Sequence, residues 1–580
     1  MNGVFNIVFI QVLRKNFLFV CIILSLLCSI TSADTHYASS LGSNEPPYTS
    51  WTTAAHDIQD AINAASPGDV IVIDDEIWNI STTLQFDLPA GSYELRSRSN
   101  NPEICILDGQ GKFRIMQITH PGVTVTIRGI TFCNSKVTVY SGGALMVGSK
   151  AGDVRLYNCI FKKNISANPD GSTAGGAIFV DRPLNNKRKI EIYNCKFLEN
   201  EANGIFSGRG GAIYIHEGNE AIIANCFFKA NATNSTDDGE GSCLYIRGIA
   251  NIKWCIFENH SGHDVHGTVI SYGDNAFVTI EDSIFDSNNA RWGGGFYTSQ
   301  GGFGHLKRCV FINNYATDLG GAIYAGGWGD LIVESSLFIS NVCGGDVAFN
   351  GGGGAAYCHL HGPLATRDKT DKFLNCTFVD NDCEAPDCVD CIYARKAGSS
   401  IYNITVNVKN CIIKGGDAEK IGGPGTASLV VSYCNIEGGY SGPGNIDLDP
   451  KFVNPLANDF HLQPTSPCID AGTSNGTPEI DLDGNCRYDD PNVENSGAGM
   501  YPYYDIGAYE FFPVCNGDVD NDGDVDGSDL AVFASDYGRT NCCEFGIPCE
   551  GNFDDDCDVD DSDLAIFTSD FGRTYCPKCP

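Results

Sequence analysis

The stretch Val154-Arg-Leu-Tyr-Asn-Cys159-Ile-Phe161 recurs almost unchanged as Ile190-Glu-Ile-Tyr-Asn-Cys195-Lys-Phe197 and Ala221-Ile-Ile-Ala-Asn-Cys226-Phe-Phe228. Its first two apolar residues are spaced by two, which places both on one face of a strand. The following three-residue step, usually across an asparagine, returns the next side chain to the same side after a bend. The pattern therefore predicts two short strands that meet at a corner.

The same pattern runs along most of the chain. It begins at Val125-x-Ile127-x-x-Ile130-x-Phe132, and later copies have Ile252/Cys255/Phe257, Ile280/Ser283/Phe285, Leu306/Cys309/Phe311, Val333/Ser336/Phe338, Phe373/Cys376/Phe378, Val408/Cys411/Ile413 and Val431/Cys434/Ile436. The copies are about 23 to 40 residues apart, which suits one coil of a solenoid with loops of variable length.

A second element, Gly-Gly-Ala-(Ile/Leu), precedes most copies. It occurs at 142–145, 175–178, 210–213 and 320–323, with degenerate forms at 241–244, 267–270, 293–296 and 353–356. A strand entered through a glycine bend explains it. We therefore predict an all-β fold, a right-handed parallel β-helix with three strands in each coil. A β-propeller of similar period is the alternative, but it needs four strands in each repeat.

Both ends of a solenoid need a cap. Helical spacing from Trp51 to Ala65, before the strand Val70 to Ile73, predicts an N-terminal cap helix. The expected units are a signal peptide (1–33), an N-terminal cap (34–85), the β-helix (86–455), a closing segment (456–512) and an acidic C-terminal domain (515–580).

The first 33 residues read as a secretory signal. The pair Arg14-Lys15 precedes an apolar run from Phe17 to Ile30 and the small residues before Asp34. The run is too short for a bilayer span, for which about 20 residues are needed. The alternative is an uncleaved membrane anchor. We expect a secreted or cell-surface protein with no membrane span after cleavage.

The formal net charge of −35 argues against nucleic acid as a partner. It also disfavours polyanionic glycans, unless bound calcium or a local basic cleft reverses the field. The charge is uneven, because 517–574 holds 17 acidic residues and two arginines.

Of the 27 cysteines, most of those in the repeat share one position with serine, so we interpret them as small buried residues. Disulfides are expected in a secreted chain. Cys383, Cys388 and Cys391 are the better candidates for pairing, and Cys542, Cys543 and Cys549 suggest a brace in the C-terminal domain.

Two parts of the chain carry a family resemblance. One is the stretch Ala-Ala-x-Asp-Ile-Gln-x-Ala-Ile in the expected cap helix. The other is the C-terminal block, with Asp481-Leu-Asp-Gly484 and Asp505-Ile-Gly-Ala-Tyr-Glu510. These residues are similar to the bacterial choice-of-anchor Q proteins, which implies a pectin-lyase-like β-helix over most of 35–512. The Gly-Gly-Ala-Ile and Phe-x-x-Asn words, as in Phe161 to Asn164, also resemble chlamydial polymorphic outer-membrane proteins, which are adhesins.

The C-terminal domain contains two copies of a calcium-loop spacing. The ligand positions are Asp518, Asp520, Asp522, Asp524, Asp526 and Asp529 in the first copy and Asn552, Asp554, Asp556, Asp558, Asp560 and Asp563 in the second. Calcium takes six to eight oxygen ligands, so short carboxylates must alternate along a tight loop. Position 6 turns the chain, and there Cys557 replaces the glycine found at Gly523. We expect two Ca²⁺ sites, the second weaker.

The duplication, the aspartate at position 12 and the loop-then-helix order resemble type I dockerins. This resemblance implies attachment to a cohesin-like or cell-surface protein.

Enzyme motifs typical of pectin-lyase-like folds are missing from the sequence. Glycoside hydrolysis needs two carboxyl groups, and β-elimination needs a base and a cation. The best candidates follow the Gly-Gly-Ala-Ile words of three consecutive coils: Asp181, His216, Glu217 and Arg247. A row of solvated loop charges is the alternative, so we leave open whether the protein is an enzyme.

Alternation along the same strands predicts a second feature. If the isoleucine and leucine residues point inward, then an outward aromatic stripe consists of Phe179, Tyr214, Tyr245, Tyr297, Tyr324 and Tyr357. Sugar rings stack on exposed aromatic faces, so a glycan platform is a hypothesis; a stripe that only stabilises the sheet is the alternative. The leading interpretation is a β-helix that binds polysaccharide, with degradation left open. The alternative is a non-catalytic surface or adhesive protein.

Overall fold

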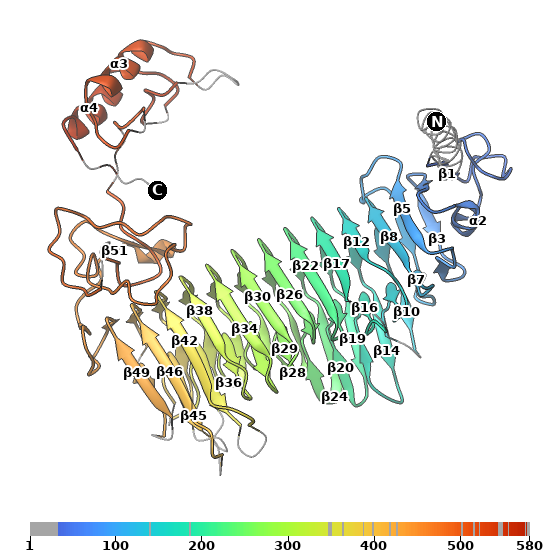
Figure 1. Ribbon diagram of the computed structural model, residues 1–580, viewed down its shortest axis with the longest axis horizontal. Helices are drawn as coiled ribbons and strands as arrows, with labels where there is room; N and C mark the ends of the chain where they lie inside the picture. Colours follow the sequence, from blue (N-terminus) through green and yellow to red (C-terminus); the bar gives the residue numbers. More distant parts are fainter. Residues whose placement is uncertain are drawn as a thin grey trace, which may run out of the picture.

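The fold is a long stack of parallel coils, shown by a computed structural model (Figure 1). It describes residues 33–580 apart from 139–140, 185–186, 346–350, 362–364, 387, 397–399, 417–418, 425–426, 500–502, 514, 516, 521, 543–548, 555, 575 and 577–580. The predicted signal peptide thus lies almost entirely outside the described residues. Within the described ranges, no helix is long and apolar enough to cross a membrane.

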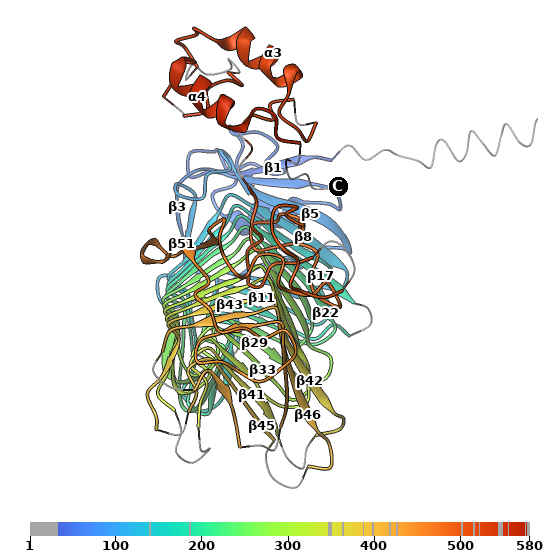
Figure 2. The ribbon, with the colours of Figure 1, turned by 90° about the vertical axis from the view of Figure 1, so that its left-hand side faces the viewer.

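Four parallel sheets form the walls of the stack. In chain order around a coil, the first sheet has 14 strands, from β1 (Thr35–Ala38) to β49 (Ser428–Ser432), and the second has 13, from β3 (Ile77–Asn79) to β50 (Asn435–Ile436). The third has 11, from β10 (Lys136–Val137) to β44 (Asp382–Cys383), and the fourth has 12, from β4 (Leu84–Gln85) to β48 (Ile421–Gly422). Figure 2 looks along the stack and shows the strands superposed.

One central coil illustrates the path. It passes through β26 (Ile249–Lys253), β27 (Ile256–Glu258), β28 (Ser261–His266) and β29 (Val269–Tyr272). The right-handed parallel β-helix is confirmed, but the prediction of three strands in each coil was wrong. The missed strand belongs to the third sheet and lies just before the glycine corner. It varies in sequence from coil to coil, so no repeated word marks it.

The repeated pattern works as its spacing predicted. Val154 and Leu156 of β12 (Val154–Tyr157) are buried, and the backbone then turns at Asn158, whose φ is 50°. Asparagine tolerates this left-handed conformation better than most residues. Phe161 then enters the core and stacks on Phe197 of the next coil, with ring centroids 5.0 Å apart. Each copy therefore builds two walls and the corner between them.

The ladder cysteines are buried free thiols, as predicted: Cys159, Cys195, Cys226, Cys255, Cys309, Cys376, Cys411 and Cys434. Disulfides join Cys383 to Cys388 and Cys542 to Cys549. Cys391 is buried and free, so its predicted pairing was wrong. Cys543 lies outside the described residues.

A buried column of asparagines satisfies the backbone at the next corner. The side-chain amide of Asn164 donates to the carbonyl of Phe132 and to Oδ1 of Asn200, each at 2.9 Å. Equivalent bonds link Asn200 to Asn231, and the column resumes from Asn288 onward. This network explains the Phe-x-x-Asn word, since a buried amide is stable only when it is hydrogen-bonded.

The N-terminal end carries a short helix. The predicted cap helix is confirmed as α2 (Ile58–Ala64), shorter than the predicted span, with Asp57 accepting from the backbone N–H of Gln59. Its Ile58 and Ile62 belong to the same buried core as the coils. The strand predicted at Val70 to Ile73 is β2.

At the other end, the segment with β51 (Phe452–Asn454), the 3₁₀ turn Pro455–Ala457 and β52 (Asp459–Leu462) folds back. Its apolar residues pack on the outer face of the second sheet, on Leu337, Ile339, Val379 and Ile412. A buried ion pair between Arg487 and Glu510, 2.7 Å long, lies in this segment. The segment thus covers the last coils from the side.

The C-terminal domain contains two helices, α3 (Gly527–Asp536) and α4 (Asp561–Asp570). Phe533 and Phe567 form its small core with Val525 and Val559, and a disulfide joins Cys515 to Cys576.

His260 occupies one position of the asparagine column, and it should make the β-helix acid-sensitive. Its ring is fully buried, and Nδ1 faces the backbone N–H of Asn231 at 3.0 Å, so it serves as an acceptor there. Burial lowers the pKa of His260 to about 4 from the ordinary value of 6.5. Between these two pH values the unfolded chain binds the proton better, so stability falls as pH falls through this window, by about 3 kcal/mol at the lower end.

We expect His260→Asn to remove this loss and to extend the asparagine column. Unfolding midpoints measured from pH 7 to pH 4 should diverge, with the variant increasingly more stable than wild type in acid. His120→Asn, which replaces an exposed histidine, is the matched control and should follow wild type. Parallel curves for wild type and His260→Asn would contradict this account.

Candidate functional site

The candidate site lies on the turns that lead from the fourth sheet to the first sheet of the next coil. These turns follow β16 (Ile178–Val180), β21 (Ile213–Ile215), β25 (Leu244–Ile246) and β29 (Val269–Tyr272). Because equivalent strands of successive coils are paired in register, their turns are stacked at about 4.8 Å intervals. Polar side chains from four coils therefore meet along one edge.

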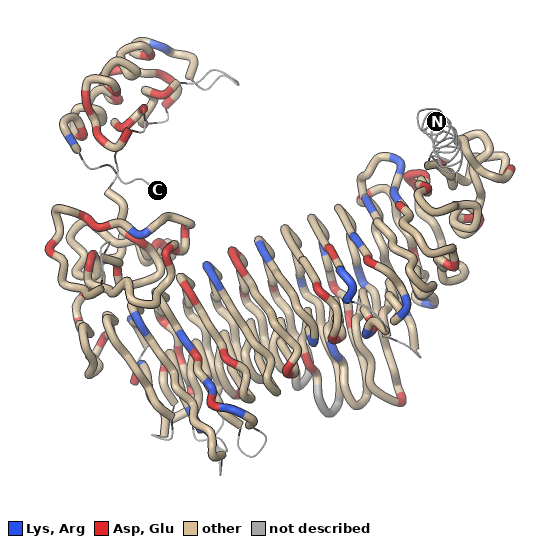
Figure 3. Tube along the Cα trace, in the orientation of Figure 1, with Lys and Arg blue, Asp and Glu red and all other residues tan. Residues whose placement is uncertain are grey.

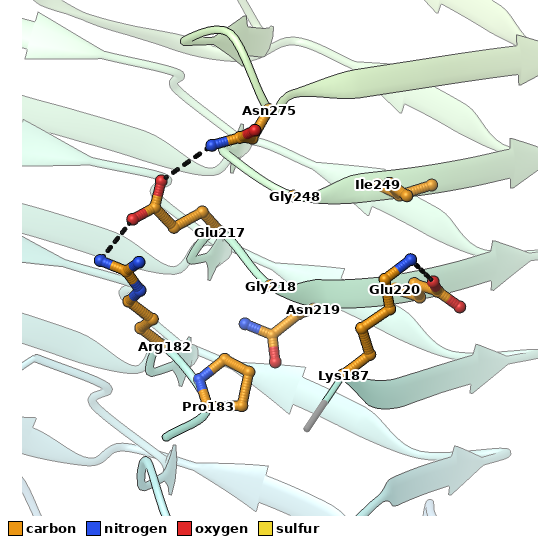
Figure 4. A pocket seen from close by; sticks show the side chains of 10 residues that line it. All are labelled: Arg182, Pro183, Lys187, Glu217, Gly218, Asn219, Glu220, Gly248, Ile249 and Asn275. Atoms are coloured by element: carbon orange, nitrogen blue, oxygen red, sulfur yellow. Dashed lines mark hydrogen bonds and ion pairs between the residues drawn. The ribbon is translucent and has the colours of Figure 1, made fainter. Parts of the chain in front are cut away.

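A hollow of about 470 Å³ opens between these turns (Figure 4). It is lined by Arg182, Pro183, Lys187, Glu217, Gly218, Asn219, Glu220, Gly248, Ile249 and Asn275. The Glu217 carboxylate has partners on both sides. It forms an ion pair with Arg182 Nη1 at 2.7 Å and accepts a hydrogen bond from Asn275 Nδ2 at 3.5 Å. One carboxylate thus connects turns of three coils.

A second hollow of about 230 Å³ adjoins the first, because Glu217 and Asn275 line both. Its other lining residues are Arg247, Tyr272, Gly273, Asp274, Gln300 and Trp328. The Trp328 indole N–H donates to Asp274 Oδ1 at 2.7 Å. The Arg247 guanidinium carbon lies 5.8 Å from the centre of the Tyr272 ring.

Arg247 offers a hydrogen-bond donor in this place. Its Nε is buried and has no hydrogen-bond partner among the described residues. Burial opposes its charge, but the neighbouring Tyr214 hydroxyl keeps the pKa of Arg247 above its ordinary value. The side chain therefore stays cationic at any physiological pH.

A third hollow of about 560 Å³ extends the series toward the N-terminus and shares Pro183 and Lys187 with the first. Shared lining makes the three hollows one groove across the coils. Three exposed cations, Lys150, Arg182 and Lys187, border it, although the chain as a whole is strongly acidic. The acidic residues Asp153, Glu217, Glu220 and Asp274 also line it, so the groove carries charges of both signs. Figure 3 marks the Lys and Arg residues in blue and the Asp and Glu residues in red along the chain.

Of the four residues predicted as catalytic candidates, the structure brings two together in one hollow and leaves the other two outside it. Glu217 and Arg247 line the same hollow. The Asp181 carboxylate instead accepts the backbone N–H of Arg182 at 2.8 Å. His216 Nδ1 is buried without a partner among the described residues, and burial together with Arg247 lowers the pKa of His216. It is therefore neutral at pH 7.

Sequence reasoning missed Arg182, Asp274, Asn275 and Trp328 as groove residues. The register of the repeat places 274–275 and 328 at equivalent turns, which was the available signal.

The aromatic stripe exists, but the prediction that its rings are exposed was wrong. The alternation was right, because Ile178, Ile213, Leu244 and Ile323 lie in the main core while the rings form a separate cluster. However, Tyr245 and Tyr357 are 1% and 0% exposed, Tyr214, Tyr297 and Tyr324 are also buried, and Phe179 is half-buried.

The third sheet is the reason for this burial. Its residues Ala174, Trp292 and Leu319 belong to the same cluster as the rings, and Trp292 stacks on Tyr324 at 5.3 Å. The rings also stack on one another, for example Tyr214 on Tyr245 with centroids 5.2 Å apart. The stripe therefore stabilises the wall and offers no platform to a glycan.

The first calcium-type loop brings its predicted oxygens together. Oxygens of Asp518, Asp520, Asp522 and Asp529 lie within 4.8 Å of one another, as do those of Asp524, Asp526 and Asp529. Asp529 accepts backbone N–H groups of Val519 at 2.7 Å and Asp526 at 2.9 Å. Burial opposes its ionisation, but these N–H groups hold the pKa of Asp529 below its ordinary value.

The second loop repeats this geometry with Asp554, Asp556 and Asp563 and with Asp558, Asp560 and Asp563. Gly523 and Cys557, at the turning position, have φ of 99° and 82°. Oδ1 atoms of Asp524, Asn552 and Asp558 are buried without a partner among the described residues. Such unsatisfied oxygens, with crowded carboxylates, fit a hard divalent cation.

Comparison with known proteins finds a short match to a repeat family and a similarity to solved structures. The repeat of Chlamydia polymorphic membrane proteins matches residues 308–326. Among solved structures, pectate lyase Pel9A is similar to this chain at 13% sequence identity and a TM-score of 0.30, over 83% of this chain and 97% of that one. No curated protein matches.

Proposed function

We propose that the β-helix binds an extended polysaccharide along the turn groove. The continuity of the three hollows carries this proposal, because successive turns about 4.8 Å apart present a repeating set of contacts to a linear chain. Arg182, Lys187 and Asn275 supply donors for hydroxyl or carboxylate groups. At one end, Tyr272 and Trp328 supply aromatic rings, on which sugar rings stack.

The contacts of Glu217 favour binding over cleavage. Its two oxygens are already engaged by Arg182 and Asn275, which suits a residue that holds the groove together and accepts sugar hydroxyl groups more than one that transfers a proton. Arg247 beside it could still serve a base–cation pair in β-elimination. The glycan-binding experiment described below therefore includes a test for cleavage products.

A non-catalytic surface or adhesive role is the second candidate. The match of residues 308–326 to the repeat of a polymorphic membrane protein supports it. The matched residues line none of the three hollows, and this role requires no cleavage of a glycan. New reducing ends or unsaturated products from a glycan panel would favour the enzyme.

We expect Arg182→Ala and Glu217→Gln each to weaken glycan binding about five- to tenfold, which corresponds to about 1 to 1.4 kcal/mol. Each removes one partner of the bridge in the centre of the groove. Affinity electrophoresis against a panel of soluble polysaccharides identifies a ligand, and calorimetry then measures the change.

Arg155→Ala is the matched control, because Arg155 forms a comparable ion pair with Glu191 at 2.6 Å but lines none of the three hollows. It should bind like wild type. If Arg182→Ala and Glu217→Gln retained full affinity for every glycan that wild type binds, the groove would not be the site.

We also propose that the C-terminal domain binds two calcium ions and attaches the secreted protein to a cohesin-like or cell-surface partner. The clustered oxygens of both loops support this role. The second site should be weaker, because Asn552 supplies a neutral oxygen where Asp518 supplies a charged one, and because Cys557 occupies a backbone conformation that favours glycine.

Calorimetric titration of the full chain with Ca²⁺ should resolve two unequal sites. Asn552→Asp should strengthen the weaker site, and Asp518→Asn should weaken the stronger one, because each changes one ligand charge. Glu550→Gln removes an exposed carboxylate outside both loops and serves as the control. Two equal sites in wild type, or none, would contradict the assignment.

Calcium affinity should fall as pH falls. Burial and neighbouring carboxylates raise the pKa values of Asp520, Asp524, Asp554 and Asp558 above the ordinary value. Protons therefore compete with calcium at higher pH than they would for isolated aspartates. Titrations between pH 7 and pH 5 in buffers of different ionisation enthalpy should show proton release on binding; affinity independent of pH would refute this competition.

A further inference from the structure

Three cysteines from two neighbouring coils lie together on the third sheet. The strand β40 (Val342–Cys343) pairs in parallel with β44 (Asp382–Cys383), and Cys343 stands opposite Cys383. Cys383 forms a disulfide with Cys388, and the Sγ atom of Cys343 lies 2.8 Å from the Sγ atom of Cys383. The three sulfur atoms belong to a small buried cluster of their own, separate from the main core.

This arrangement gives Cys383 two possible partners. Cys388 is on the same loop, and Cys343 is on the adjacent strand. Residues opposite each other in neighbouring strands are about 4.8 Å apart, within the 4.4–6.8 Å range of Cα separations that disulfides span. A bond between Cys343 and Cys383 would therefore need little movement of the coils.

The backbone passes close over these sulfur atoms. A Cβ atom added at Gly352 would lie 2.8 Å from Sγ of Cys343 and 2.9 Å from Sγ of Cys383. Gly352 is buried, so no side chain larger than hydrogen fits between the backbone and the sulfurs. The cluster is enclosed on this side and holds Cys343 against the disulfide.

We propose that Cys343, Cys383 and Cys388 form a thiol–disulfide exchange site. The Cys343 thiolate attacks Sγ of Cys383, a bond forms between these two sulfurs, and the bond from Cys383 to Cys388 breaks. Cys388 leaves as a thiolate and takes up the proton that Cys343 gave to solvent. Sulfur oxidation is unchanged overall, so the step needs no external oxidant.

The exchange changes what the loop presents. In the first state the disulfide lies within the loop, and in the second it joins two coils and leaves Cys388 as a free thiol. Glu384 and Pro386, between Cys383 and Cys388, are exposed. Local movement of this loop would bring Cys388 to solvent, where its thiolate can attack a disulfide of another molecule. Cys388 is then the residue at which the protein forms a mixed disulfide with another molecule.

The rate should increase with pH. Burial raises the pKa of Cys343 to about 12, and the carboxylates of Asp382 and Glu384 act in the same direction. Backbone contacts of Cys343 with Gly320 and Gly345 oppose this rise, and the hydroxyl of Tyr315 is the further titratable group beside it. Because only the thiolate attacks, each one-unit increase in pH below that value should speed exchange by up to about tenfold.

Disulfide mapping of the full chain tests the proposal. The protein is incubated with N-ethylmaleimide at pH 7 and pH 9, quenched, digested without reduction and analysed by mass spectrometry. We expect a linked peptide of Cys343 with Cys383 and maleimide on Cys388, accumulating much faster at pH 9. The proposal is overturned if Cys383 remains bonded to Cys388 at both pH values and Cys343 is labelled only after denaturation.

Two variants separate exchange from general opening of the fold. Cys343→Ser removes the attacking thiol, so labelling of Cys388 should disappear while the Cys383–Cys388 bond persists. Cys309→Ser is the matched control, because serine already occupies its ladder position in other coils, at Ser283 and Ser336. It should label like wild type. Equal labelling of Cys388 in wild type and Cys343→Ser would also overturn the proposal.

Discussion

In-register hydrogen bonding between successive parallel coils is the constraint on which this structure depends. It places equivalent residues of neighbouring coils opposite each other, as with Phe161 and Phe197. One residue type repeated along the sequence then becomes a continuous column in space. Apolar columns fill the core, and polar columns persist only where each member hydrogen-bonds to the next, as Asn164 does to Asn200. His260 fits by shape and as an acceptor, but it brings a titratable ring into that column.

The same constraint explains where function can arise. Residues inside a column are committed to packing, whereas the turns between the fourth and first sheets carry no such requirement. Their side chains differ from coil to coil, yet the register still stacks them closely. Glu217 therefore meets Arg182 from the preceding turn and Asn275 from two turns later. A groove built in this way extends with the number of coils, which suits a linear ligand.

Cysteine shows how local setting decides chemistry. In the main ladder, Cys309 packs as a small buried residue beside positions held by serine. On the third sheet, Cys343 lies against a disulfide that its neighbour already forms. The two thiols have similar burial and both have raised pKa values. Only the second has a sulfur partner with which a bond can be exchanged.

The sequence by itself determined the features that depend on local spacing: the parallel coils, the corner at Asn158, the buried cysteine ladder and the two acidic loops. These follow from backbone geometry and from contacts between identical positions. Only the tertiary structure decided what covers an outward face. The alternation placed Tyr245 outside the core correctly, but an irregular third strand buries it. The groove likewise depends on side chains from separate coils, such as Glu217 and Trp328, whose proximity no local pattern encodes.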